Sequence, residues 1–289
     1  MIPKRILKVL SVAALMASLV SCVPLPNPVN LPASLSGYQI VAGPPASVGA
    51  NGTVLISASC PASKVVVGGG YDASADTAAV ARVSQPISHG TGWSVKVKNE
   101  TPVGFTPFKV TPFAICVDKP ADYEVLPSRS NLQNQEINTV SAPCSKSSQF
   151  VSGGGMSTSD DSVRPFHQSV RTSPEQFEAS AKNHLVLPGN SDFTVTAICA
   201  DFTQLPGREI VQSASSSASG WQLVKLTANC PAGKSVLSGT MISLNNELVA
   251  VDSKPAGNGS GWMVTVHNAE PISSPKSAAL QIVCAKVTP

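Results

Sequence analysis

The sequence repeats one phrase three times at a nearly constant spacing, and this repeat limits the folds that the chain can adopt. The stretch GWSVKVKN around Trp93 returns as GWMVTVHN around Trp262, and a weaker copy, FEASAKN, begins at Phe177. The two steps between these aromatic residues are 84 and 85 residues. A fixed period of this kind is typical of tandem copies of one structural unit. The sequence therefore predicts three units of about 85 residues each.

Other landmarks keep the same period. Each unit starts with an opening phrase, at Tyr38, Tyr123 and Arg208. A first cysteine follows, then a glycine nine residues later, and a second cysteine closes the unit. The first cysteines are Cys60, Cys144 and Cys230, the glycines are Gly69, Gly153 and Gly239, and the second cysteines are Cys116, Cys199 and Cys284. These landmarks divide the chain into repeats at 38–122, 123–207 and 208–289.

The cysteines can be assigned from the repeat. Seven are present, and Cys22 stands apart from the six in the repeats. Six cysteines allow fifteen pairings, but the repeat selects one bridge within each unit. The predicted bridges are Cys60–Cys116, Cys144–Cys199 and Cys230–Cys284. Loops of this length restrict the unfolded chain by about 4 kcal/mol per bridge. Reduced core thiols are the alternative, and the oxidising compartment indicated by the N-terminus disfavours them.

The residue pattern within each unit indicates β-strands. The repeated phrases alternate apolar and polar residues, which is the period of a strand with one buried face. No segment sustains apolar residues at helical spacing. We expect an all-β chain with about four or five strands per unit. We also expect Trp93, Trp221 and Trp262 to enter strands and pack into the core; presentation of their indole faces to a glycan is the alternative.

Two further repeated features predict local geometry. The glycines at 68–70 and 153–155 are not followed by the Lys-Ser/Thr pair and helix of a phosphate-binding loop, so they indicate a bulge or a tight bend. Asn99, Asn183 and Asn268 end the same strand in each unit and should cap a turn with their side-chain amides.

The N-terminus carries a secretory signal. A basic start precedes the apolar run Ser11 to Val20, which is too short to span a membrane as a mature helix. The end of this segment, Leu19-Val20-Ser21-Cys22, resembles the lipobox of bacterial lipoproteins. The resemblance implies that residues 1–21 are removed and that Cys22 is acylated and becomes the first residue of the mature chain. An ordinary signal peptide is the alternative.

Residues 22–37 are rich in proline and form a tether after the acylated cysteine. Prolines at this density favour an extended chain, and two or three acyl chains give stable attachment to membrane lipid. Val23 after Cys22 resembles the sorting pattern of outer-membrane lipoproteins. The sequence thus predicts a lipid-anchored protein of the bacterial cell envelope, at the outer membrane, facing the periplasm or the surface.

A second resemblance concerns the repeats. The phrase Cys-Pro-x-Gly, complete at Cys230 to Gly233, precedes a strand that contains glycine, and it resembles a motif of the vitelline membrane outer layer protein family. That family folds as a three-sided β-prism, so the resemblance implies pseudo-threefold packing of residues 38–289. The units here are longer, and the middle unit has Ser145 in place of the proline. Small β-sandwich units are the alternative.

Charge and motifs argue against several functions. Without the three basic residues of the signal peptide, 17 basic residues face 17 acidic ones, so no excess positive charge is present to bind nucleic acid. No zinc-binding, nucleophile-elbow or phosphate-loop motif is present. His167 and His184 are the only pair that we would test for copper or zinc. We therefore predict a protein that is not an enzyme and that has no cofactor and no metal site.

Two function classes remain. The first is a structural or accessory subunit that docks onto a larger envelope assembly; the second is a surface module that binds a glycan or another small ligand. A metal-dependent enzyme is a distant third. The middle unit keeps its landmarks but gathers charge in the segment DDSVRPFHQSVRTSPEQ, which we interpret as a loop. Candidate partner-binding residues lie in this segment and are Asp160, Asp161, Arg164, Phe166 and His167.

Overall fold

The computed structural model describes residues 34–74, 76–101, 106–185, 189–270 and 274–289. In these residues the regular structure is β-strand, apart from two short 3-10 turns, Ser88–Gly90 and Phe202–Gln204. The predicted all-β fold is therefore confirmed. The predicted signal peptide and most of the tether, including Cys22, lie outside the described residues.

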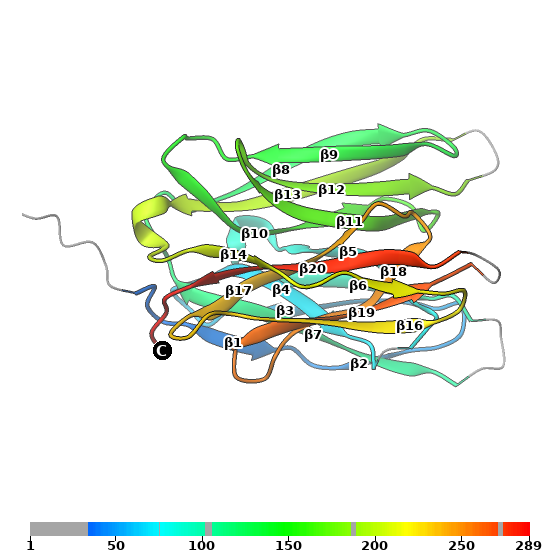
Figure 1. Ribbon diagram of the computed structural model, residues 1–289, viewed down its shortest axis with the longest axis horizontal. Coiled ribbons are helices and arrows are strands. Elements are labelled where there is room, and N and C mark those ends of the chain that lie inside the picture. The colour runs from blue at the N-terminus through cyan, green and yellow to red at the C-terminus, as the bar shows by residue number, and fades with distance from the viewer. Residues whose placement is uncertain (1–33, 75, 102–105, 186–188, 271–273) are drawn as a thin grey trace, which may run out of the picture. The chain divides into compact units, whose positions relative to one another are not determined.

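The strands fall into three consecutive groups, which we call the first, middle and third units (Figure 1). The first unit contains β1 (Gln39–Ala42), β2 (Ala46–Val48), β3 (Thr53–Ser59), β4 (Lys64–Asp72), β5 (Ala79–Pro86), β6 (Gly92–Asn99) and β7 (Phe108–Asp118). The middle unit contains β8 (Glu124–Leu132), β9 (Ile137–Pro143), β10 (Gln149–Thr158), β11 (Val163–Thr172), β12 (Glu175–Asn183) and β13 (Ser191–Asp201). The third unit contains β14 (Glu209–Gln212), β15 (Ser216–Ala218), β16 (Leu223–Asn229), β17 (Ser235–Ser243), β18 (Leu248–Pro255), β19 (Gly261–Asn268) and β20 (Lys276–Ala285).

Each unit thus has six or seven strands among the described residues, more than the four or five expected. The opening strands account for part of the difference. In the first and third units they are split into pieces of three or four residues, such as Gln39–Ala42 and Ala46–Val48, which are too short to show an alternating pattern.

Each unit is a small sandwich of two antiparallel layers. In the middle unit, β8, β13 and β10 form one layer, and β9, β12 and β11 form the other. The first and third units repeat this order, with the split strands β1 and β2, or β14 and β15, in the place of β8. The repeated aromatic residues Trp93, Phe177 and Trp262 are all buried between the layers. Burial of these large rings is the main apolar contribution of the repeated phrase.

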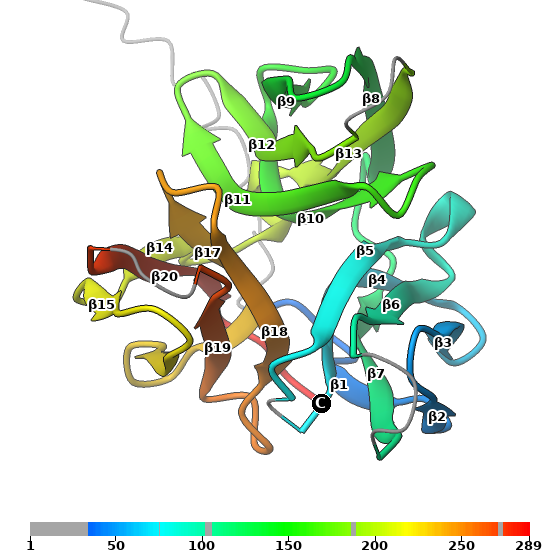
Figure 2. The same ribbon diagram turned by 90° about the vertical axis from the view of Figure 1, so that its right-hand side faces the viewer.

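The three sandwiches close into a ring around a pseudo-threefold axis, which Figure 2 shows end-on. At the first junction, β5 pairs with β10 of the middle unit through Ser84 and Met156. At the second, β18 of the third unit pairs with β4 of the first unit through Ser253 and Tyr71. The units therefore share one continuous core.

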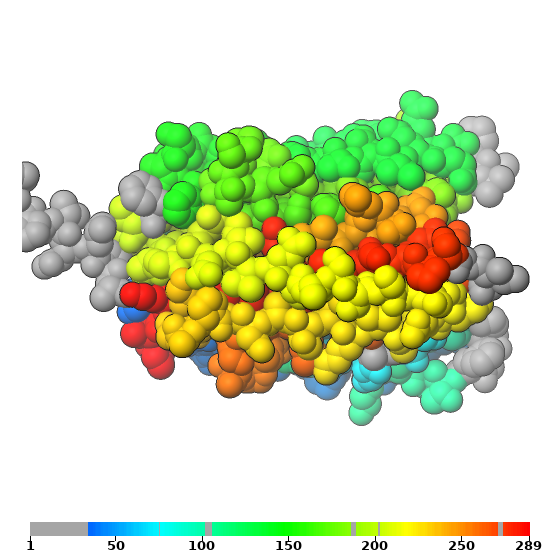
Figure 3. Space-filling model, viewed as in Figure 1, coloured from blue at the N-terminus to red at the C-terminus, as the bar shows by residue number. Residues whose placement is uncertain are grey.

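Side chains make the third junction, between β11 and β17. Nδ1 of His167 lies 2.9 Å from the carbonyl oxygen of Ser243. The side-chain amide of Gln281 accepts a hydrogen bond from the backbone N–H of Val170 (2.7 Å) and donates one to its carbonyl oxygen (3.3 Å). In the space-filling view, the middle unit in green lies directly against the third unit in yellow to red (Figure 3).

One strand position explains why the third junction differs. Gly70 and Gly155 lie where the first two junctions form, and a Cβ atom on either would come within about 2.1 Å of a backbone oxygen across the junction, that of Ser253 or Ser84. The corresponding residue of β17 is Thr240. A residue with a Cβ atom cannot approach its neighbour as closely, so the ladder of the other two junctions does not form here.

Adding one methyl group at such a junction should be costly. We expect Gly70→Ala to lower the free energy of unfolding by about 1–3 kcal/mol, because the added Cβ atom meets backbone that cannot rotate away. Gly257→Ala is the control, since a Cβ atom at that position meets nothing within 4 Å. Urea denaturation of both variants measures the difference; equal midpoints would contradict the close approach.

The opening residue of each unit fastens it to the preceding unit of the ring. The hydroxyl of Tyr38 donates to the carbonyl oxygen of Val236 (2.9 Å), and that of Tyr123 donates to the carbonyl oxygen of Val66 (2.6 Å). In the third unit the guanidinium of Arg208 takes this place and donates through Nε to the carbonyl oxygen of Val151 (2.9 Å). The opening phrases therefore serve the assembly of the ring.

The glycine-rich strands contain the predicted bulges. The register shifts at Val67, Ser152 and Leu237, and these residues meet across the pseudo-threefold axis. The hydroxyl of Ser152 lies 3.3 Å from the carbonyl oxygen of Val67, and that of Ser238 donates to the carbonyl oxygen of Ser152 (2.9 Å).

A glycine two residues after each bulge makes room for the buried aromatic ring. A Cβ atom would lie 2.4 Å or less from the ring of Trp93, Phe177 or Trp262; the glycines are Gly69, Gly154 and Gly239. In the middle unit the glycine beside the ring is thus Gly154, one residue after the Gly153 that the repeat predicted. The middle unit has one more residue between its first cysteine and its bulge than the other two units.

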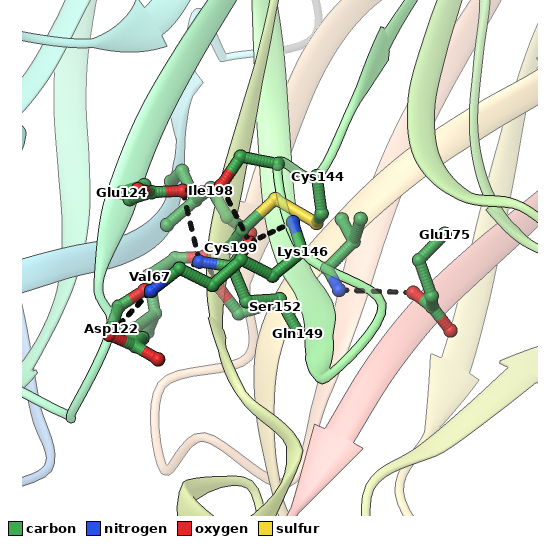
Figure 4. The surroundings of a disulfide bond; sticks show 12 residues. Val67, Asp122, Glu124, Cys144, Lys146, Gln149, Ser152, Glu175, Ile198 and Cys199 are labelled. Atoms are coloured by element: carbon green, nitrogen blue, oxygen red, sulfur yellow. Dashed lines mark hydrogen bonds and ion pairs between the residues drawn. A yellow bond between two sulfur atoms is a disulfide. The ribbon is translucent and has the colours of Figure 1, made fainter.

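The structure contains the three predicted disulfide bonds, Cys60–Cys116, Cys144–Cys199 and Cys230–Cys284. The second cysteine of each bridge is fully buried. Around the middle bridge, Lys146 forms a 2.8 Å ion pair with Asp122, and the carboxylate of Glu175 accepts a hydrogen bond from the backbone N–H of Val151 (Figure 4). Disulfides persist outside the reducing cytosol, so the protein belongs to the cell envelope or the extracellular space.

Candidate functional site

The segment expected to be a binding loop is mostly a strand. Residues 163–172 form β11, which pairs with β12 along its length. The interpretation of this segment as a loop was wrong, because its alternation is masked by charged residues that are paired across unit junctions. Lys96 and Lys98 of the first unit each lie 3.1 Å from the carboxylate of Asp161, and Arg164 lies 2.6 Å from Glu100.

The other three candidates also have partners or are buried. Asp160 accepts a hydrogen bond from the backbone N–H of Ser162 (2.6 Å), and Phe166 is buried. His167 lies at the third junction, where its Nε2 atom is 3.2 Å from the hydroxyl of Ser169. The segment therefore joins the middle unit to both neighbours.

The two histidines of the middle unit do not form a pair. His184 follows the end of β12, beside Ser162, whereas His167 pairs with Ser180 further along the sheet. Four residues of strand, about 13 Å, separate their positions. Among the described residues no group of three or more histidine, cysteine or carboxylate side chains could hold a metal ion.

The structure brings a different set of side chains together, at the end of the ring where β6, β12 and β19 finish. A pocket of about 330 Å³ opens there between all three units; we call it the axial pocket. Its volume lies in the range of about 300–1,000 Å³ that is usual for small-molecule sites. Its lining residues are Thr77, Ala78, Val80, Glu100, Thr101, Arg164, Trp221, Val249, His267 and Ala269.

Trp221 is the exposed residue that distinguishes this pocket. Its side chain is 59% exposed, unlike the buried Trp93 and Trp262. The expectation that all three tryptophans pack into the core was therefore wrong for Trp221. This residue lies in the turn before β16, with a left-handed φ of 58°, where the corresponding turns have Asn51 and Gln135.

Tryptophan is a costly choice for such a turn. A left-handed backbone favours glycine or asparagine, and a bulky residue there is strained. Strain of this kind, together with exposure, points to a role in binding. The spacing contains the signal that sequence reasoning missed, because Trp221 lies only 41 residues before Trp262 and so falls outside the 85-residue period.

His267 lines the axial pocket beside Trp221. The two ring centroids are 5.8 Å apart and the rings are tilted by 35°. His267 replaces Lys98 and Lys182 of the other units and is 3% exposed. Burial lowers the pKa of His267. A hydrogen bond with the backbone of Thr77 has the opposite, smaller effect on this pKa.

The Nε2 atom of His267 has no hydrogen-bond partner within the described residues. A buried polar atom without a partner costs about 1–3 kcal/mol. His267 is also one of the residues that line the axial pocket.

Two charged residues, Glu100 and Arg164, also line the axial pocket, and both lie near the buried Arg82. Glu100 receives hydrogen bonds from two guanidinium groups, those of Arg164 and Arg82. Arg82 is 1% exposed and also donates to the carbonyl oxygen of Val163 (2.8 Å). Burial lowers the pKa of Arg82, while the charge of Glu100 opposes that change. Two cations thus share one carboxylate beside the pocket.

A second pocket of about 220 Å³ adjoins the first and shares Arg164, Val249 and Ala269 with it. Its remaining lining residues are Lys182, His184, Asn246, Glu247 and Glu270. Burial, followed by the charges of Arg164, Lys182 and Arg82, lowers the pKa of His184 to about 4, and Glu100 opposes this. His184 is therefore neutral at neutral pH.

This arrangement is suited to binding. It presents one flat aromatic face, a carboxylate and a guanidinium, and imidazole nitrogens that can exchange hydrogen bonds. Among the described residues, no helix is long and apolar enough to cross a membrane. No known family model matches the chain, and a search of the curated proteins found no match. The residues of the axial pocket therefore provide the basis for a functional conclusion.

Proposed function

We propose that this chain is a non-catalytic, lipid-anchored protein of the bacterial cell envelope that binds a saccharide in the axial pocket. The observation that carries the proposal is Trp221, an exposed indole held in a left-handed turn above the buried and unpartnered Nε2 atom of His267. Strained, exposed aromatic residues beside unsatisfied polar groups are typical of binding sites.

The chemistry of a sugar ring matches this pair. A pyranose has a face of C–H groups and a rim of hydroxyls, so it needs a flat apolar surface next to hydrogen-bonding groups. The indole of Trp221 supplies the surface. His267, Glu100 and Arg164 supply the polar groups around it.

Docking onto an envelope assembly is the second candidate. The observation in its favour is that β3, β9 and β16 lie at the outer edges of their sheets, and each carries an exposed apolar side chain, at Leu55, Ile137 and Leu223. Exposed edges can pair with a strand of a partner. These side chains come from three different units, which makes a single docking surface less well supported than the pocket.

The saccharide proposal predicts a specific loss of binding. We expect Trp221→Ala to weaken binding to immobilised oligosaccharides at least tenfold, a loss of about 1.4 kcal/mol or more, because the stacking surface is removed. Its melting temperature should stay within about 2 °C, since the side chain is mostly exposed.

The measurement is a titration of the full chain in detergent micelles against oligosaccharides identified on a glycan array. Leu55→Ala is the control, because it removes an exposed apolar side chain of the first unit outside the axial pocket. Absence of all glycan binding by the wild-type protein, or equal binding by Trp221→Ala, would refute the proposal.

Membrane attachment is a separate prediction. We expect the wild-type protein to enter the detergent phase on Triton X-114 partitioning, because two or three acyl chains hold it in the membrane. Cys22→Ser should leave an uncleaved precursor or a protein in the aqueous phase, and mass spectrometry of the N-terminal peptide should show the acyl groups only in the wild type. Equal partitioning of both proteins would remove the lipid anchor from the proposal.

A further inference from the structure

Buried polar atoms without a hydrogen-bond partner gather around the axial pocket. Within the described residues, four buried side-chain polar atoms have no hydrogen-bond partner, and three of them are nitrogens of this region: Nε of Arg82, Nε2 of His184 and Nε2 of His267. Each such atom costs free energy while it is unsatisfied. Two of these residues line the two adjoining pockets, His267 the axial pocket and His184 the second.

Four cations and three carboxylates lie around the two pockets, namely Arg82, Arg164, Lys182 and Lys276 with Glu100, Glu247 and Glu270. Arg82 and Arg164 share Glu100. The other two carboxylates at the rim, Glu247 and Glu270, both lie close to Lys276, at 3.0 and 3.6 Å.

Lys182 lines the second pocket together with Arg164 and the carboxylates Glu247 and Glu270. No ion pair is recorded for it in the part of the chain that the structure describes, and its ammonium lies 3.2 Å from the side-chain oxygen of Asn246 once that amide is oriented to satisfy its neighbours. Burial is the main cause of the low pKa of His184; the charges of Arg164, Lys182 and Arg82 lower it further, and that of Glu100 opposes them.

We infer that the ligand is an acidic saccharide, whose ring lies on Trp221 and whose anionic group lies in the second pocket, between Arg164, Lys182 and His184. This inference rests on the proposed saccharide-binding function and names its ligand class. A planar guanidinium and an ammonium on two sides of one small pocket are suited to a carboxylate. A phosphate substituent carries the same kind of charge and is distinguished by the probes below.

The units contribute unequally to this recognition. Trp221 comes from the third unit and the cations Arg164 and Lys182 from the middle unit. The corresponding positions elsewhere in the ring are Val80 and Val249 for Arg164, and Lys98 and His267 for Lys182. Only one such site can therefore form around the axis, and the divergence of the middle unit supplies its charge.

The test uses probes that differ only in charge. Calorimetric titration of the full chain in detergent micelles compares oligogalacturonate with its fully methyl-esterified form, and a maltose oligosaccharide with its 6-phosphate. An array of matched acidic and neutral glycans covers other sugar rings. We expect acidic members to bind at least tenfold more tightly than their neutral counterparts, and we expect added salt to reduce the difference.

Two variants locate the charge. Lys182→Gln should reduce the preference for the acidic probe about fivefold or more and leave neutral probes unchanged. Arg164→Gln should reduce this preference too, but it should also weaken neutral probes, because Arg164 lines the axial pocket and pairs with Glu100, so Lys182→Gln is the decisive variant. Lys119→Gln is the matched control, an exposed lysine beyond the far end of β7.

The outcomes separate this inference from the proposed function. Equal binding of acidic and neutral probes, lost in Trp221→Ala, would overturn the inference and keep the saccharide-binding function. Acidic probes can also bind tightly to the wild type and equally tightly to Lys182→Gln and Arg164→Gln. This result would overturn the inference as well, because the anionic group would then bind outside the second pocket. Absence of binding to every glycan would overturn both. Binding of phosphorylated but not carboxylated probes would overturn the assignment of the anionic group as a carboxylate.

Discussion

Removing the middle disulfide with the double variant Cys144→Ala/Cys199→Ala should lower the free energy of unfolding by about 4 kcal/mol. The bridge closes a loop with a sequence separation of 55 residues, and cross-linking a loop of this length removes about that much conformational freedom from the unfolded chain. The loss should be large because Cys199 is fully buried and pairs with Val151, next to the bulge of β10 at Ser152.

Guanidinium denaturation followed by circular dichroism measures this effect. The double variants of the first and third bridges should lose similar amounts, because their loops have nearly the same length, 56 and 54 residues. A loss below about 1 kcal/mol would mean that the reduced unfolded chain is already constrained. Non-reducing peptide mapping provides the companion measurement, and any bridge between units would contradict the fold.

The second large effect is expected at the buried tryptophan of the third unit. Trp262→Ala should cost about 3–5 kcal/mol, since the side chain is 1% exposed and its removal leaves a cavity between the two layers. Its indole N–H also donates to the hydroxyl of Ser253 (2.9 Å), which would lose that partner.

A conservative variant and a contrasting one make this test specific. Trp262→Phe should cost only about 1–2 kcal/mol, mainly for the lost hydrogen bond, because the middle unit has Phe177 in the same place against Gly154. Trp221→Ala should leave stability almost unchanged while it weakens binding at least tenfold. Similar losses of stability for Trp221→Ala and Trp262→Ala would contradict the assignment of Trp262 to the core and Trp221 to the pocket.

The features that sequence reasoning predicted correctly are those that repeat with the chain. The disulfides are one case. The asparagines that end β6, β12 and β19 are another. Each accepts a hydrogen bond through Oδ1 from the backbone N–H two residues on, and donates through Nδ2 to the opening strand of its own unit; they are Asn99, Asn183 and Asn268. Three copies of one local interaction reinforce one another in the sequence, so a pattern of residue types is sufficient to reveal them.

The binding loop expected at 160–176 illustrates the opposite case. The charges of Asp161 and Arg164 indicated an exposed segment, but their partners Lys96, Lys98 and Glu100 lie in the first unit, about 65 residues away in the chain. Charge alone does not distinguish a residue that meets solvent from one that is paired across a junction, because the pairing partner is set by the closure of the ring.

Composition and period were therefore sufficient for the bridges and the β-structure, since each follows from contacts within one repeat. The axial pocket could not be predicted in the same way. Arg164, Trp221 and His267 come from two units and meet the first unit at Glu100 only when the three sandwiches close around their axis. Their value as a site depends on the burial of His267 and the exposure of Trp221, and packing between units determines both.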